Sequence, residues 1–189
     1  MGLFKSIKDS ILFNRMIKQS FREQQAREAL YMQMSPGELS KLTDDELFCA
    51  ALIRTERAAD AFPDNWPLNA INALNEKQRV FYSVNFLITE VNNGGICQFF
   101  VNSSRMVAPK LSEYLGIIGA ADHQKLYDDF ISKYNIDVND LSSFRSDTTE
   151  KFIAQYERYP FDEYDNAFFT LKPLEEYLAG FVRANITYF

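Results

Sequence analysis

Apolar residues recur at three- and four-residue steps along most of the chain, which is the spacing of one face of an α-helix. The clearest run joins Val80, Phe81, Val84, Leu87, Ile88 and Val91. Similar faces occur in the ranges 4–21, 48–62, 111–118, 126–134, 152–156 and 174–182. No alternating, strand-like pattern competes with them. The pattern therefore predicts an all-α fold, a single compact domain of about eight helices.

Residues 1–30 are predicted to form an amphipathic helical arm, and residues 31–189 the globular domain. Residues 1–27 carry six basic and two acidic side chains, whereas residues 28–189 carry 14 basic and 24 acidic ones. The arm is predicted to pack on the domain or on a second copy of it. The alternative is a basic helix lying on a membrane surface, and Met1 to Ser6 also fits a myristoylation pattern.

Short polar motifs mark several helix starts. Ser35 with Glu38, and Thr43 with Glu46, have the spacing of a capping box. The run Asp147-Thr148-Thr149-Glu150 resembles a further cap. A break is predicted at residues 63–67, with Trp66 packing over the loop, and a short helix is predicted at residues 68–74.

One stretch, from Glu90 to Ser104, combines small, amide and aromatic residues in a non-repetitive order. The helix through Val91 should end at Asn92-Asn93-Gly94-Gly95, because Gly and Asn accept the positive φ common at helix ends. A shorter helix should follow from Ile96. The side chains of Asn92, Asn93, Gln98 and Asn102 are expected to pair with backbone groups left open at the turn.

Two functional interpretations of this junction stay open beside that structural one. The amides after Gly94-Gly95 could hold an anion at a helix N-terminus. Alternatively, Cys97 could be a thiol with a lowered pKa and His123 its base, with Asn92, Gln98 and Asn102 orienting a ligand. The alternative function is thus a small-molecule-binding protein or thiol enzyme centred on the Asn92–Asn102 junction. His123 itself is expected to face solvent.

Composition narrows the class of protein. The hydrophobic content of 47% excludes a disordered chain, and the net charge of −6 argues against direct nucleic-acid binding. Two separated Cys and no apparent export signal favour the cytoplasm, and no apolar run is long enough for membrane insertion. With a single His and no Cys-x-x-Cys, no metal site and no cofactor are predicted. The carboxylate pairs in the sequence are adjacent residues, which point in different directions on a helix and make a poor acid/base pair. An enzyme is therefore not predicted.

Acidic residues gather in the second half of the chain. From residue 122 to residue 176 there are 13 acidic and six basic side chains. Such a surface attracts a basic partner protein by steering and complementarity. The predicted partner-binding residues are Asp128, Asp129, Asp137, Asp140, Asp162, Glu163 and Asp165.

The junction also resembles the signature of the bacterial DNA-mimic protein C-terminal-domain family, otherwise described as a domain of unknown function. The residues that carry the resemblance are Asn92, Asn93, Gly94, Gly95, Gln98, Phe99, Phe100, Asn102 and Ser103. The segments 115–120 and 165–177 resemble further parts of the family, so the similarity spans about residues 74–184.

The resemblance implies an all-helical fold, self-association as a homodimer and no enzymatic activity. It also implies that acidic side chains stand in for DNA phosphates on the DNA-binding face of another protein. The shared residues are amide, Gly and Phe rather than acids. They are therefore interpreted as residues that shape the fold and do not carry the charge-based function. The resulting prediction is a cytoplasmic, non-enzymatic module that binds a partner protein, with DNA mimicry as its implied role.

Overall fold

The computed structural model describes residues 2–62 and 68–189, with side chains described from residue 18 to 62 and from residue 69 onward. These residues form helices and turns without a β-strand, which confirms the all-α prediction. The α-helices are α1 (Gly2–Gln33), α2 (Pro36–Leu39), α3 (Asp44–Asp60), α4 (Leu68–Ala73), α5 (Glu76–Val101), α6 (Ala108–Ile117), α7 (Ala121–Lys133), α8 (Thr149–Arg158), α9 (Phe161–Thr170) and α10 (Leu174–Ala184). Short 3₁₀ helices are η2 (Ser103–Val107), η3 (Ser142–Phe144) and η4 (Ile186–Tyr188).

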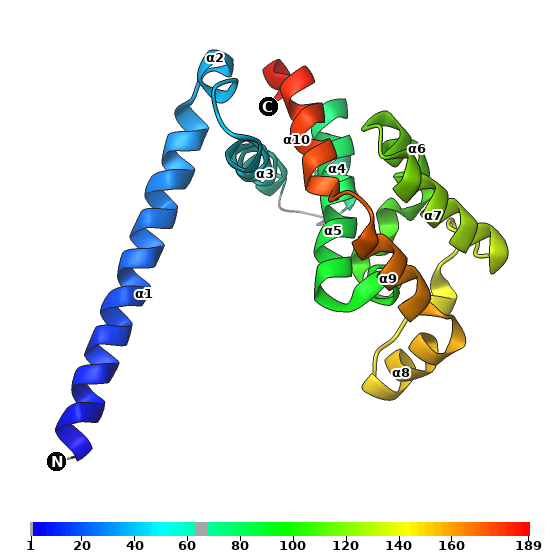
Figure 1. The fold of residues 1–189 in the computed structure, drawn as a ribbon, viewed down its shortest axis with the longest axis horizontal. Helices are drawn as coiled ribbons and strands as arrows, with labels where there is room; N and C mark the ends of the chain where they lie inside the picture. The colour runs from blue at the N-terminus through cyan, green and yellow to red at the C-terminus, as the bar shows by residue number, and fades with distance from the viewer. Residues whose placement is uncertain (1, 63–67) are drawn as a thin grey trace.

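Helix α5 is the centre of the molecule, and α3, α6, α9 and α10 all pack against it (Figure 1). Its first turn begins at Asn75, whose side-chain oxygen accepts the Gln78 amide at 2.9 Å. The six apolar residues predicted on one face of α5 are all buried. Tyr82, Ser83 and Asn85 are buried as well, because neighbouring helices cover α5 on more than one side.

Aromatic rings fill the space between α5, α7 and the segment that follows α7. Phe100 and Phe130 are fully buried, and their ring centroids lie 5.7 Å apart. Phe144 approaches Phe100 to 5.0 Å, and Tyr164 approaches Phe130 to 4.8 Å. Contacts of this kind contribute beyond the apolar area they bury, so the ring cluster fixes α9 against α7.

The long helix α1 extends away from the other helices for most of its length (Figure 1). It packs on α3, where Glu28 accepts a hydrogen bond from Arg57 at 2.8 Å and Tyr31 is buried. Its helical character agrees with the predicted arm, although the helix continues to Gln33. The side chains of the first 17 residues lie outside the described part of the chain.

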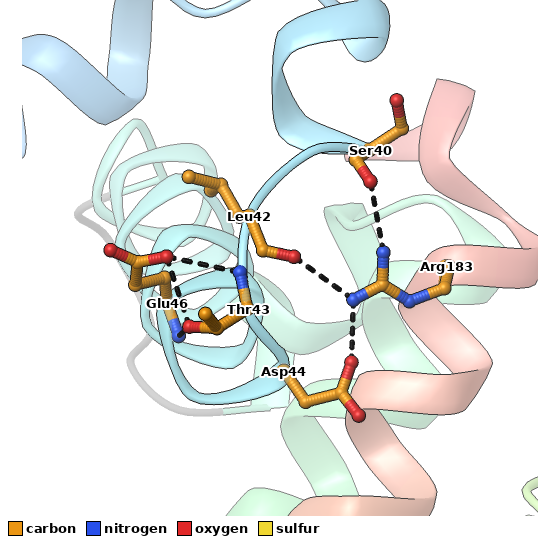
Figure 2. A network of polar contacts seen from close by, with 6 residues as sticks. All are labelled: Ser40, Leu42, Thr43, Asp44, Glu46 and Arg183. Atoms are coloured by element: carbon orange, nitrogen blue, oxygen red, sulfur yellow. Dashed lines mark hydrogen bonds and ion pairs between the residues drawn. The ribbon is translucent and has the colours of Figure 1, made fainter.

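Both predicted capping boxes are present. The Ser35 side chain accepts from the Glu38 amide, and the Thr43 side chain from the Glu46 amide. Figure 2 shows Arg183 of α10 reaching the same region, where its guanidinium donates to the carbonyls of Ser40 and Leu42. Arg183 also pairs with Asp44, so α10 is tied to the turn before α3.

Three local expectations differ from the structure. Helix α9 was not predicted, because Pro160 was taken as a break, although Phe161, Tyr164 and Phe168 that follow it have helical spacing. Phe62, expected near the core, is 48% exposed. His123, expected to face solvent, is only 3% exposed, because Phe168 of α9 covers it. The expected packing of Trp66 concerns residues outside the described part.

Candidate functional site

The chain bends sharply inside α5 at two consecutive glycines. Gly95 has φ 76° and ψ −178°, a conformation that only Gly adopts without strain. Gly94 is also non-helical, at φ −172° and ψ 27°. The predicted break at Gly94-Gly95 is therefore confirmed, and we call residues 92–98 the elbow.

Asp165 of α9 closes the elbow from outside α5. Its Oδ1 accepts the Ile96 amide at 2.7 Å, which satisfies the first open donor after the bend. A Cβ on Gly95 would lie 2.1 Å from Asp165 Oδ2, so only Gly admits the carboxylate. Burial raises the pKa of Asp165 and the nearby Asp162 adds to this, although the Ile96 amide works in the opposite direction.

A second carboxylate, Glu90, gathers the polar side chains around the elbow. Glu90 Oε2 accepts from Gln98 Nε2 at 2.9 Å and from Asn102 Nδ2 at 2.7 Å. Glu90 Oε1 accepts from Ser104 Oγ at 2.7 Å. The two halves of α5 are thus held across the bend by one acidic side chain.

The expected roles of the amide side chains are wrong in detail. Gln98 and Asn102 bond to Glu90 rather than to open backbone groups, and Asn92 and Asn93 are exposed. Phe99 and Phe100 of the same motif are fully buried. The sequence interpretation missed Glu90 as the common acceptor and Asp165 as the cap, although Glu90 lies two helical turns before Gln98.

The thiol interpretation of the junction does not fit the structure. Cys97 is buried, and burial raises its pKa to about 12, with a further contribution from Asp165. A nucleophilic Cys requires the opposite shift. The anion interpretation fails at Ile96, whose amide already bonds to the chain's own Asp165. Several polar groups of the elbow thus bond within the chain, as expected of residues that shape the fold.

His123 lies in an apolar environment near the elbow. Its ring meets Phe168 edge-on at 5.0 Å, and neither ring nitrogen has a hydrogen-bond partner in the described part of the chain. Burial lowers the pKa of His123, and Asp122 opposes this only in part. Burial therefore favours the neutral form of His123.

The predicted acidic residues lie on α7, on α9 and in the segment that links α7 to η3. Asp128 accepts from Ser112 Oγ at 3.0 Å, and Asp129 pairs with Lys125. Asp137 accepts the Asn139 amide at 2.9 Å, and Asp140 the Ser142 amide at 3.1 Å.

On α9, Asp162 accepts from the Tyr156 hydroxyl, and Glu163 is exposed. Asp165 is the exception among the seven predicted residues, because it is half-buried and turned toward the elbow. Six of the predicted carboxylates are therefore exposed on the surface, whereas the seventh, Asp165, accepts the Ile96 amide.

Within the described residues, no group of His, Cys, Asp and Glu side chains is arranged to hold a metal ion. A search of the same residues found no helix both long and apolar enough to cross a membrane.

Comparison with known proteins identifies the family. Residues 72–185 match the family described as DMP19-like protein, which confirms the resemblance seen over about residues 74–184. The match takes in α5 to α10 and therefore the elbow, Glu90 and the acidic segment. Comparisons with curated proteins and with solved structures found no match. Since the matched segment covers more than half of the sequence, this chain belongs to the DMP19-like protein family.

Proposed function

We propose that this protein is a DNA mimic, which acts by binding and not by catalysis. Its acidic surface would occupy the DNA-binding face of a partner protein in the cytoplasm. Family membership supports this role, because imitation of DNA is what the resemblance implies for the family. The elbow and Glu90 would supply the rigid frame, while carboxylates outside the elbow make the contact.

The observation that carries the proposal is the set of hydrogen bonds that the surface carboxylates accept. Asp128, Asp137, Asp140 and Asp162 are all exposed, and each accepts a hydrogen bond from a neutral donor. A neutral donor orders a carboxylate without cancelling its charge, whereas a Lys partner would cancel it. Negative charges at fixed positions are what a protein needs to replace the phosphates of a duplex.

The surrounding charges support the same interpretation. Between residues 122 and 176, Lys residues pair with Asp129, Asp147 and Glu176. Asp122, Glu150, Glu157 and Glu163 are exposed and have no ion-pair partner in the described part of the chain. The segment thus keeps a negative excess that a basic DNA-binding face can neutralise. We leave Asp165 out of the contact surface because its carboxylate serves Ile96.

The test uses two double variants with equal charge change. Asp128→Asn/Asp162→Asn keeps an acceptor oxygen for Ser112 and Tyr156 but removes two surface charges. Asp45→Asn/Glu76→Gln removes two exposed charges outside the acidic segment and is the matched control. Proteins captured on the wild-type chain are identified, purified and measured against all three forms, with and without a short DNA duplex as competitor.

We expect a DNA-binding protein that the duplex displaces. Its affinity should fall about tenfold for the first variant and hardly change for the control, because close charge pairs at an interface contribute more than a kcal/mol. Binding that the duplex does not displace, or an equal loss in both variants, would contradict DNA mimicry.

A further inference from the structure

A basic pocket, lined by Arg105 and Arg145, lies at the end of the family motif beside the acidic segment 122–176. It has a volume of about 390 Å³ and lies between η2 with the start of α6 and the segment 138–145. Arg105 and Arg145 both line it, and both also line an adjoining depression of about 320 Å³ that continues toward Lys151. The two guanidinium groups therefore stand where two hollows meet.

The two arginines differ in how they are held. Arg105 is partly buried, and its Nη1 donates to the carbonyls of Val101 and Asn102, which leaves Nε and Nη2 without a partner in the described part of the chain. The Arg145 side chain is exposed and its guanidinium has neither a hydrogen bond nor an ion pair in that part, while its backbone amide donates to the Ser142 carbonyl. Burial lowers the pKa of Arg105, and the charge of Arg145 lowers it further. Because both side chains line the same two hollows, their like charges are unfavourable there without an anion.

Two carboxylates lie on the walls of these hollows, and neither forms an ion pair with either arginine. Asp147 pairs with Lys151. Asp140 accepts the Ser142 amide, and the Arg145 charge helps to lower the Asp140 pKa, after its bonds to Ser142. Across the two hollows, three cationic side chains, including Lys151, face two anionic ones. The local charge is therefore positive, although the net charge of the chain is −6.

We propose that this pocket binds the phosphate group of a small phosphate monoester. A dianion with several oxygens can serve two guanidinium groups at once, whereas a carboxylate is satisfied by a single bidentate Arg. Ser103 and Asn139 add polar side chains to the walls. Met106, Val138 and Leu141 form an apolar side against which the ester part packs. The volume lies within the range of small-molecule sites.

This site shares Asp140 with the carboxylates proposed for DNA mimicry, but it depends on positive rather than negative side chains. Its test uses calorimetric titration with adenosine 5′-monophosphate and with inorganic phosphate, at an ionic strength held constant with chloride. Arg145→Gln removes a charge that makes no contact needed for folding. Arg158→Gln is the matched control, since Arg158 is exposed on α8 outside both hollows.

We expect the monophosphate to bind, and to bind more tightly than inorganic phosphate because of the apolar side. The dissociation constant should rise at least about tenfold in Arg145→Gln, as for loss of a charge-assisted hydrogen bond, and stay unchanged in Arg158→Gln. Absence of binding at millimolar monophosphate would overturn the proposal. An equal loss in both variants, or equal affinity for the two probes, would do so as well.

Discussion

Gly95 is the residue at which the bend is most sensitive to substitution. Gly95→Ala would put a Cβ at a φ of 76° and 2.1 Å from Asp165 Oδ2. Strain of this kind costs about 1–3 kcal/mol before the displaced carboxylate is counted. We expect the free energy of unfolding, measured in urea, to fall by at least about 2 kcal/mol.

Gly180 of α10 is the matched control for that substitution. A Cβ there meets no atom within 4 Å, so Gly180→Ala should raise the free energy of unfolding by about 0.5–1 kcal/mol. A Gly95→Ala protein as stable as the wild type would show that the bend does not depend on Gly at this position.

His123 gives the chain a pH dependence that can be isolated. Because burial lowers its pKa in the folded state, the unfolded chain takes up the proton first as the pH falls. The free energy of unfolding should therefore decrease below about pH 6.5, by at most about 1.4 kcal/mol per pH unit. Urea titrations between pH 5 and 8 should show this slope.

The control is His123→Phe, which removes the only His in the sequence. The difference in stability between wild type and variant isolates this residue from the carboxylates, which titrate in both. A difference that stays constant over the whole pH range would contradict the inferred shift.

At the scale of elements, Glu90 joins the two halves of α5 through Gln98, Asn102 and Ser104. Glu90→Ala leaves a good helix former but removes a charged acceptor of three hydrogen bonds. We expect a loss of about 2 kcal/mol in the free energy of unfolding. Glu157→Ala, at an exposed position of α8, should change it by less than about 0.5 kcal/mol. Equal effects of the two substitutions would mean that Glu90 does not stabilise the elbow.

Local chemistry explains which elements could be predicted. Both capping boxes and the Gly94-Gly95 break depend on residues within a few positions of one another, and all three are present. The Asp165–Ile96 bond joins residues 69 positions apart, and no periodicity encodes such a contact. His123 was misjudged for the same reason, because Phe168 of the unpredicted α9 covers it.

The candidate surface was predictable in composition but not in arrangement. The acidic excess of residues 122–176 is visible in the sequence. The Lys pairs of Asp129, Asp147 and Glu176 are local, four residues apart. By contrast, the inward turn of Asp165 depends on how α9 packs on α5. The basic pocket could not be predicted from the sequence, because Arg105 and Arg145 are 40 positions apart and are brought to one pocket by the placement of η2 and η3.

At the scale of the whole molecule, Arg183 joins the family-matched part to residues before it. Its guanidinium donates to the carbonyls of Ser40 and Leu42 and pairs with Asp44. Arg183→Gln should lower the free energy of unfolding by about 1–2 kcal/mol, and it should speed proteolytic cleavage near residue 41. Asp44→Asn removes only the exposed ion pair and should cost less than about 1 kcal/mol. Unchanged cleavage in Arg183→Gln would show that other contacts hold this turn.

The hydrogen bond from Ile96 to Asp165 allows the packing of α9 on α5 to be measured at a single amide. Within the described residues, the Asp165 carboxylate on α9 is the acceptor of the Ile96 amide proton, because the bend leaves this amide without a helical acceptor. Hydrogen–deuterium exchange at this one proton therefore follows the docking of α9 on α5. A partner that binds the acidic side chains of α9 and shifts this helix would change that exchange rate, even without contacting Gly94 or Gly95.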